Sequence, residues 1–499
     1  MRFTRLSVGV LGLAAISACK TDLTALNEDP NSPKLAPAGP LFTSATRSAI
    51  ATFQNSANTL SMTELFAQQI AQIQYIDEDR GHIRPANIDG MFNALYGGPL
   101  QDLQKLILVA DSTKQPNASA PAKVLESWIF QNMTDLWGDI PYTAALKGGP
   151  GGDFQPKYDT QKDVYYGLLK TLTDAAVALK IQPTLNDPSL GNADPLYNGD
   201  NAQWIKFDNA LRARLAMRMS KADPAKANAE LTAAFAGGMF TSNSDNAKVL
   251  WPGDGIYDNP WASNFAGRDD HRMAKTFIDT LKALSDPRLP IFAQPTNDDP
   301  TVYAGMQNGL DNTYTARFFN TTSRPGAIFY PGATVYGNFG SSAGKALPSY
   351  ILTFAEVSFI QAEAAERSLG GLTPAAAAGF YNAGVTASIT QWGGSAADAA
   401  AYLASPGVAY VPGASGLKQI GLQKWIALFT QGTEAWSEWR RTGNPASIVA
   451  GPRMYSDAQG VARRLLYPPA EQSNNGASLT AAIADQGPDA ISTRVWWDK

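Results

Sequence analysis

The sequence of 499 residues predicts a mainly α-helical protein, with paired helices and a central region rich in irregular loops. Three observations predict this fold class. Apolar residues recur at helical spacing, start and stop signals frame several helices, and a glycine turn joins two helical segments into a hairpin. The length alone would allow three domains, although many single large folds reach it.

The segment 204–220 shows helical spacing most clearly. Its apolar residues recur every four positions and are Phe207, Leu211, Leu215 and Met219. This spacing places them on one face of an amphipathic helix that packs on a core. Arg212 and Arg218 fall off that apolar stripe.

Two further helices are predicted from their ends. Thr160 and Asp163 fit a capping box before an apolar periodic segment, because each can hydrogen-bond the other's backbone. Asp223 followed by Pro224 predicts the start of another helix, and the glycine pair at 237–238 predicts its end.

The segment 348–392 predicts a hairpin of two helices around the glycine pair at 370–371. Several such hairpins would form a tetratricopeptide-like stack, although the sequence lacks a clean 34-residue repeat. A further helix is predicted over 418–441, interrupted at Gly432 and closed by Gly443 and Pro445.

The charge content argues against nucleic acid as a partner. Charged residues make up 17% of the chain, the formal net charge is -4, and no Lys/Arg cluster is present. A protein that follows a phosphate backbone normally carries a basic patch. The single cysteine, Cys19, excludes an internal disulfide and a cysteine-rich zinc site.

The N-terminal residues predict a lipoprotein signal peptide over 1–18. Arg2 and Arg5 precede an apolar run from Leu6 to Ala18, which is shorter than the roughly 20 residues that span a bilayer. The sequence ISAC at 16–19 resembles a bacterial lipobox, in which Cys19 becomes the acylated first residue. Residues 19–39, polar and proline-rich, are then expected to form a tether to the membrane.

The loop-rich region, about 240–347, is the expected ligand side. Its aromatic rings can stack on the C–H face of a sugar while polar groups bind the hydroxyls, although single rings can equally fill the core. The candidate ligand-binding residues are Trp251, Tyr257 and Trp261 from this region, with Tyr75 and Arg80 from an earlier polar loop.

No usable catalytic pattern is evident. The only histidines are His82 and His271, and the one G-x-S-x-G match, at 340–344, has no histidine after it. No metal-site, P-loop or dinucleotide motif is present, so neither a metal nor a cofactor is expected. A carboxylate pair that meets only in space remains open, and with it a secreted glycan hydrolase.

Ten segments in a fixed order resemble the SusD/RagB family of nutrient-binding outer-membrane lipoproteins, in its SusD-like branch. They are NEDPNSP (27–33), LWGDIPYTAAL (136–146), YDTQKDVYYGLL (158–169), NALRARLAMRMS (209–220), DPRLP (286–290), FAEVSFIQAEAAER (354–367), FYNAGVTASITQW (380–392), QKWIALFTQGTEAWSEWRRTGNP (423–445), RRLLYPPAEQSNN (463–475) and STRVWWDK (492–499). With the lipobox, they extend over nearly the whole mature chain.

The resemblance implies one helical domain over 40–499, with a tetratricopeptide-like scaffold, long irregular loops and a few short strands. It implies no catalysis. It also implies capture of oligosaccharide or peptide and delivery to a TonB-dependent, SusC-like β-barrel in the outer membrane. An acidic run is expected after the cysteine of a surface-exported lipoprotein. Here it is reduced to KTD (20–22), so a single acidic residue supports the expectation that the protein faces the cell surface. A scaffold lipoprotein that binds only protein is the other alternative.

Overall fold

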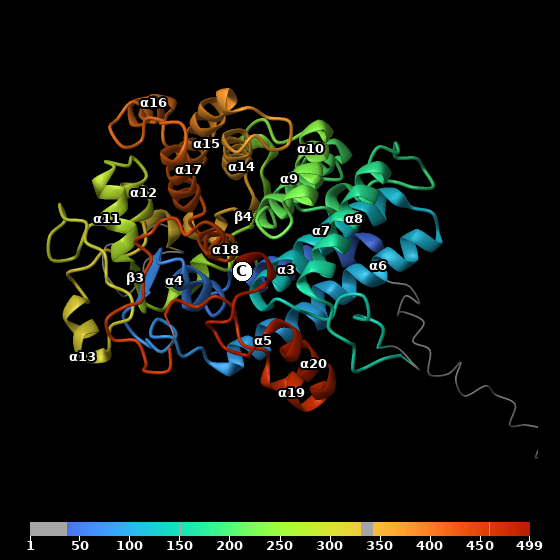
Figure 1. Cartoon of the computed structure of the whole chain (residues 1–499), viewed down its shortest axis with the longest axis horizontal. Coiled ribbons are helices and arrows are strands. Elements are labelled where there is room, and N and C mark those ends of the chain that lie inside the picture. Colours follow the sequence, from blue (N-terminus) through green and yellow to red (C-terminus); the bar gives the residue numbers. More distant parts are fainter. Residues whose placement is uncertain (1–36, 149–151, 331–342, 459) are drawn as a thin grey trace, which may run out of the picture.

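The computed structural model describes residues 37–148, 152–330, 343–458 and 460–499. The predicted signal peptide (1–18), Cys19 and most of the tether lie outside these residues. The described helices are α3 (Ala38–Gln54), α4 (Glu64–Phe66), α5 (Pro85–Leu95), α6 (Gln101–Ser112), α7 (Pro116–Trp137), α8 (Gln161–Ala178), α9 (Asn201–Arg218), α10 (Pro224–Gly237), α11 (Lys275–Ala283), α12 (Leu289–Phe292), α13 (Asn312–Thr315), α14 (Phe354–Glu366), α15 (Ala377–Gln391), α16 (Ala396–Leu403), α17 (Ala414–Ala427), α18 (Gly432–Thr442), α19 (Pro469–Asn474) and α20 (Gly476–Gln486). Figure 1 shows their arrangement in one domain.

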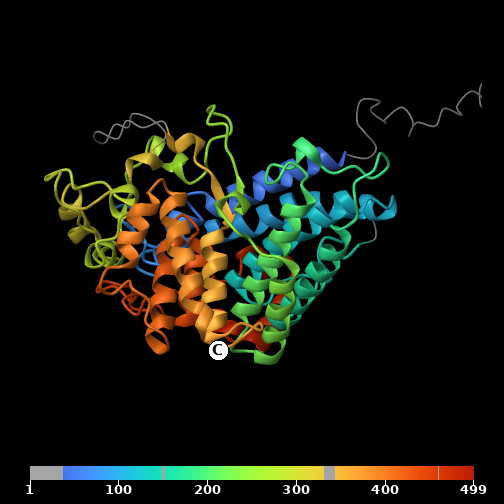
Figure 2. The same cartoon turned by 90° about the horizontal axis from the view of Figure 1, so that it is seen from above.

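Consecutive helices pack against each other in pairs. The main pairs are α7 with α8, α9 with α10, and α14 with α15. Figure 2 shows α8–α10 and α14–α17 standing side by side, with much of the chain between α10 and α14 beyond one end of them. The predicted fold class, a helix-pair scaffold with irregular loops and a few short strands, is confirmed.

The predicted helix starts are confirmed, although only half of the predicted capping box forms. The Thr160 hydroxyl accepts a hydrogen bond from the Asp163 backbone N–H at 3.2 Å, directly before α8, while the Asp163 carboxylate accepts from the Thr160 hydroxyl at 2.8 Å. The Asp223 carboxylate caps α10 by accepting from the Lys226 N–H at 3.0 Å. All four members of the apolar stripe on α9 are buried, so its predicted core face is confirmed.

The helical segment predicted over 418–441, with an interruption at Gly432, is two helices: α17 ends at Ala427, and α18 begins at Gly432. Thr430 between them adopts a positive φ of 72°. A Cβ at Gly432 would lie 2.5 Å from the Thr63 hydroxyl. The break and the glycine therefore let α18 approach the π-helical turn η1 (Thr59–Thr63) closely.

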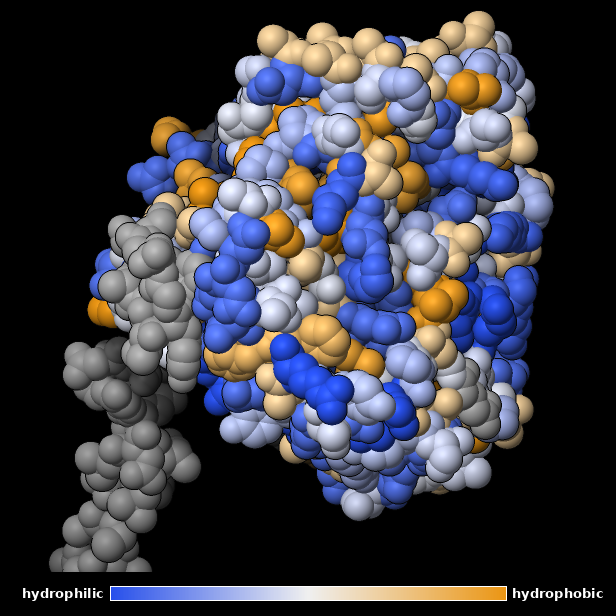
Figure 3. Space-filling view, turned by 90° about the vertical axis from the view of Figure 1, so that its left-hand side faces the viewer, coloured by the Kyte–Doolittle hydropathy of each residue, from blue (hydrophilic) through white to orange (hydrophobic). Residues whose placement is uncertain are grey.

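Two short antiparallel ladders tie the region after α10 to the scaffold. Strand β1 (Ile70–Gln72) pairs with β3 (His271–Met273), and β2 (Ala247–Val249) pairs with β4 (Ser349–Leu352). This region also contains α11, α12 and α13 and is more regular than the sequence indicated. Figure 3 shows the side where α11–α13 lie: hydrophilic and hydrophobic residues are interspersed there.

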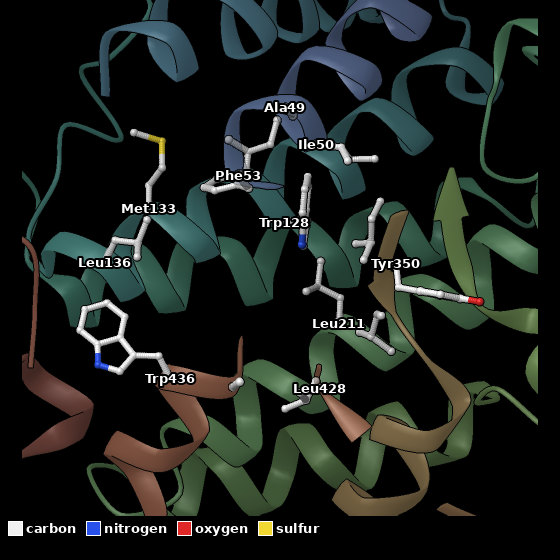
Figure 4. Close-up of a cluster of buried hydrophobic side chains, with 14 of the residues drawn as sticks. Ala49, Ile50, Phe53, Trp128, Met133, Leu136, Leu211, Tyr350, Leu428 and Trp436 are labelled. Atoms are coloured by element: carbon white, nitrogen blue, oxygen red, sulfur yellow. The ribbon is translucent and has the colours of Figure 1, made fainter. Parts of the chain in front are cut away.

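Large aromatic side chains join the scaffold elements in one core (Figure 4). Phe53 of α3 meets Trp128 of α7 edge to face, with ring centroids 5.3 Å apart. Leu211 of α9 and Tyr350 of β4 are buried in the same cluster. Each such side chain contributes about 1.5–3 kcal/mol when buried.

A network of buried ion pairs also crosses the scaffold. Arg214 of α9 binds Glu356 of α14 at 2.6 Å. Arg218, which was expected off the packed face, is buried between Asp135 of α7 and Glu434 of α18. Burial alone would raise the pKa of Glu434, but Arg218 and Arg214 hold that pKa below its usual value. A buried charge without its partner would strongly destabilise the fold, so these pairs favour the arrangement of helices in which each charge meets its partner.

Among the described residues, no helix has the length and apolar character needed to cross a bilayer.

Candidate ligand-binding site

Antiparallel pairing of β1 with β3 brings two loops to one place. The loop 73–84 follows β1, and residues 266–270 precede β3, so both lie at the same end of the ladder. The backbone N–H of Ile73 confirms this by donating to the Asp270 carbonyl at 2.8 Å. The ladder therefore places two polar loops, far apart in sequence, side by side.

Tyr75 is the exposed ring of this loop pair, with 58% of its surface accessible. The Arg268 guanidinium lies 4.9 Å from the ring centroid, and that of Arg84 lies 5.9 Å away. Arg84 also donates to the Tyr75 carbonyl at 3.1 Å. Tyr75 has a positive φ of 53°, an uncommon backbone state that clusters at ligand-binding sites. The result is an exposed aromatic ring with two cationic side chains near its centroid.

A second aromatic group lies at the other end of the loop. Arg80 lies 3.9 Å over the Tyr455 ring, and His82 stacks on the same ring at 3.8 Å. Two groups this close to one centroid must occupy opposite faces. The Tyr455 hydroxyl donates to Asp77 at 2.7 Å, and His82 Nε2 lies 2.7 Å from Asp457. These contacts fasten the loop 73–84 to the segment 453–457.

A pocket of about 620 Å³ opens between these elements. This volume is within the range of small-molecule sites, roughly 300–1,000 Å³. Its walls combine charged, aromatic and apolar groups: Asp77, Gly81, His82, Ile83, Arg84, Pro85, Tyr455, Asp457, Leu466, Ala490, Ile491 and Ser492. Arg84 belongs to the pocket wall and to the Tyr75 group, so it joins the two.

Two buried carboxylates hold the base of the loop. Burial raises the pKa of Asp79 to about 7, although Asn308 donates to it at 2.7 Å. Burial also raises the pKa of Glu78, and the ion pair with Arg84, at 2.9 Å, opposes that shift. The loop therefore has a fixed base beneath the exposed Tyr75, which reduces the ordering cost of binding.

The structure corrects the expected exposure of the two tryptophans. Trp251 is only 7% exposed, and its indole N–H donates to the Ser349 hydroxyl at 2.8 Å. Trp261 is 2% exposed and packs against Phe329, with centroids 5.0 Å apart. Its N–H donates to Glu64 at 2.8 Å. Neither indole can stack on a ligand, because both fill the core beneath the loops.

Tyr257 is exposed, as a stacking ring requires, with 48% of its surface accessible. It lies on a tight turn that Asp254 holds by accepting from the Tyr257 N–H at 2.8 Å. Its ring lies 4.8 Å from the Arg47 guanidinium of α3. Tyr75 and Arg80 thus share one loop, whereas Tyr257 is placed on another element, and a ligand role for all three remains a prediction.

Sequence reasoning missed Arg84, Arg268, His82 and Tyr455 as neighbours of the predicted residues. Arg84 and His82 lie in the same polar loop as Tyr75, which was a usable signal. Arg268 and Tyr455 reach the site only through long-range pairing, and their segments show no period that reveals side-chain direction. Within the described ranges, no group of three or more His, Cys, Asp or Glu residues could hold a metal ion.

Comparisons with known proteins agree with this architecture. A chitin-binding protein is 27% identical, with a TM-score of 0.77, over 93% of this chain and 100% of its own. A SusD homologue from Bacteroides thetaiotaomicron is 25% identical, with a TM-score of 0.76, over 93% and 99%. A chitin-binding SusD homologue from Flavobacterium johnsoniae, 24% identical over 91% and 98% with a TM-score of 0.76, shows the same fold.

No curated protein sequence matches this chain. The model of a SusD-like family, described as starch-binding and associating with the outer membrane, matches residues 30–468. That match covers most of the 499 residues. The chain therefore belongs to the SusD-like family.

Proposed function

We propose that this protein captures oligosaccharides on the surface formed by Tyr75, Arg84 and Arg268. The observation that carries the proposal is the exposed Tyr75 ring with two arginines near it, beside a pocket of about 620 Å³. A sugar ring can place its C–H face on the tyrosine while the guanidinium groups donate to its hydroxyls. The relative that is named as chitin-binding makes chitin oligosaccharides the first ligands to test.

The proposed activity is binding without catalysis. The two carboxylates of the pocket wall, Asp77 and Asp457, already accept hydrogen bonds from Tyr455 and His82. They serve to fasten the loop rather than to flank a scissile bond. A glycan hydrolase would need a free acid and base on either side of the bond.

The proposed location is the outer membrane, to which the N-terminal residues would attach the protein. Residues 1–18 would be removed, Cys19 would be acylated, and 19–39 would tether the binding domain, 40–499, at the cell surface. The bound glycan would pass to a TonB-dependent, SusC-like β-barrel. The family description, associating with the outer membrane, supports this setting.

Isothermal titration with chitin- and starch-derived oligosaccharides and with a peptide panel tests the capture step. We expect one glycan class to bind and Tyr75→Ala to weaken its affinity at least tenfold. Tyr257→Ala is the matched exposed-tyrosine variant, and its effect decides whether that ring also contacts ligand. Unchanged affinity in Tyr75→Ala would reject this site, and turnover of any ligand by the pure protein would reject a non-catalytic function.

Membrane attachment and partnership are tested in cells. Cys19→Ser should release the protein from membranes while leaving its unfolding curve unchanged, because the acyl chains are the proposed anchor. Retention of the variant on membranes would reject the anchor. Affinity purification of the wild-type protein from detergent extracts should recover a TonB-dependent barrel, and its absence would count against delivery to such a partner.

A further inference from the structure

A second pocket, of about 330 Å³, lies away from the Tyr75 surface. It is bounded by the end of α5, the π-helical turn η2 (Tyr96–Leu100), the segment 141–148, residues 153–156 and Glu471 of α19. Helix α19 is held on α5 by the Ala470 N–H, which donates to Asp89 at 3.1 Å. A π-helical turn is rare and often marks a functional site.

Aromatic rings form part of the pocket wall. Phe92 and Tyr96 pack with centroids 4.8 Å apart, and the Tyr96 hydroxyl donates to the Pro141 carbonyl at 2.5 Å. Phe154, from residues 153–156, also lines the pocket and is 72% exposed. A Cβ at Gly148 would lie 3.2 Å from the Phe154 ring, so the glycine allows the ring to lie against the chain. A large exposed phenylalanine beside a pocket suits a ligand with an apolar face.

Two carboxylates complete the wall. Glu471 Oε2 accepts from the Tyr158 hydroxyl at 2.7 Å and from the Asn475 amide at 3.2 Å. Its Oε1 accepts no hydrogen bond from any described residue. Among the described residues, Asp153 Oδ1 accepts only from the Gln155 N–H, at 2.8 Å, and the Asp153 side chain is exposed. Both carboxylates therefore have oxygens available to a ligand.

None of the described residues that line the pocket carries a positive charge to balance these acids, and Lys147, in the wall segment 141–148, donates to the Thr143 carbonyl. The lining residues of the pocket are Phe92, Asn93, Tyr96, Gly97, Gln101, Pro141, Ala145, Leu146, Gly148, Asp153, Phe154, Pro156 and Glu471, and none is Lys, Arg or His. An ammonium group gains from carboxylates and from aromatic faces together, and such combinations recognise organic cations. The Tyr75 surface has the opposite character, because arginines flank its ring.

We propose that this pocket is a separate binding site for a protonated amine carried on a compact body, either an amino sugar or a lysine side chain. The ammonium lies against Glu471 and Asp153, and the C–H surface of the ligand lies on Phe154. The site does not depend on the Tyr75 surface, since the two pockets have no lining residue in common. It would make this pocket, in contrast to the Tyr75 surface, selective for amine-bearing ligands over their acetylated forms.

Ligand-observed NMR titration of the Tyr75→Ala variant, which lacks the ring proposed to bind oligosaccharides, tests the site with matched pairs. The pairs are a glucosamine disaccharide against its N-acetylated form, and a short lysine peptide against its side-chain-acetylated form. We expect at least one amine to bind at least tenfold more tightly than its acetylated partner, and the member that binds identifies the source of the amine. Equal affinity within both pairs, or no binding of either amine, overturns the proposal.

Variants locate the binding in this pocket. The double variant Glu471→Gln with Asp153→Asn should weaken amine binding at least tenfold, because it removes both charges while glutamine can still accept from Tyr158. Asp111→Asn, on α6, removes a charge outside the pocket and should have no effect. Amine binding should be retained in Tyr75→Ala. Loss of amine binding in Tyr75→Ala, or its persistence in a folded double variant, overturns the proposal.

Discussion

The scaffold and the ligand-side loops use the same residue types in opposite ways. In the scaffold, Arg440 is buried with its guanidinium 3.9 Å over Trp436 and 4.8 Å over Trp497. In the loops, Arg268 lies 4.9 Å over Tyr75, but the ring stays open to solvent. A stacked arginine is therefore no sign of a ligand site by itself. Exposure of its aromatic partner distinguishes recognition from packing.

The largest expected effect comes from breaking a buried ion pair of the scaffold. Arg218→Ala leaves Asp135 and Glu434 buried with one partner fewer, and we expect a loss of about 4 kcal/mol in the free energy of unfolding. Urea denaturation measures the loss. Arg268→Ala breaks a pair in which the arginine is half exposed, although Asp270 is buried, and it should cost less, about 1 kcal/mol. Similar losses for both variants would contradict the contrast between the regions.

Trp261→Ala tests whether the loop region has a core of its own. Because the indole is buried among Phe265, Phe329 and Phe429, its removal should cost about 3 kcal/mol or more, near the lower end for such cavities. Tyr257→Ala, in the same region but exposed, should change stability by less than about 0.5 kcal/mol. Thermal unfolding of the two variants distinguishes a buried ring from an exposed one. A stable Trp261→Ala protein would place the indole outside the core.

A smaller effect is expected from pH at Glu64, the acceptor for Trp261. Burial raises the pKa of Glu64 from 4.5 to about 7, against the hydrogen bond from Trp261. The folded chain thus keeps a proton that the unfolded chain releases between these values. The stability that Glu64 contributes is full below about pH 4.5 and is lost as pH rises through about 7.

Glu64→Gln should remove this part of the pH dependence, about 2 kcal/mol between pH 5 and pH 8. Urea unfolding of wild type and variant at both pH values measures the difference between them. The variant is needed because burial also raises the pKa of Asp79 to about 7, so the wild-type pH dependence contains the contributions of both carboxyl groups. Parallel pH profiles for the two proteins would show that Glu64 does not titrate in this range.

The smallest stability effect is expected for Tyr75→Ala, below about 0.5 kcal/mol, since the ring is exposed. The same variant should show the tenfold or larger loss of oligosaccharide affinity stated above. Its melting temperature and its binding isotherm together sharpen the contrast, because we expect the variant to lose ligand affinity while it keeps its stability. A drop in melting temperature comparable to that of Trp261→Ala would show that Tyr75 supports the loop instead.

The scaffold could be predicted because its signals are local. The stripe on α9 and the caps at Thr160 and Asp223 depend on residues within a few positions of each other. The buried position of Arg218 could not be predicted, because its partner Glu434 comes from a helix far along the chain. A polar residue on a helix looks solvent-facing until its distant partner is known.

The site was only partly predictable for a related reason. Tyr75 and Arg80 stand out as polar-loop residues, and the structure places them on one loop. Trp251 and Trp261 share the aromatic, glycine-rich surroundings of Tyr257, yet they point inward. In a helix or strand, the position of a residue in the repeat determines the direction of its side chain, and these loops have no such repeat. Aromatic content alone therefore could not separate core rings from exposed ones.

The β1–β3 ladder has a consequence for the order of folding. Gln72 and His271 are roughly 200 residues apart, so their pairing closes a long stretch of chain, at an entropic cost that neighbouring helix pairs do not incur. Contacts of this range form late, whereas the α9–α10 and α14–α15 pairs are local. The local helix pairs can thus form before the Tyr75 surface exists, and a newly made chain becomes able to bind only when the loops 73–84 and 266–270 have met.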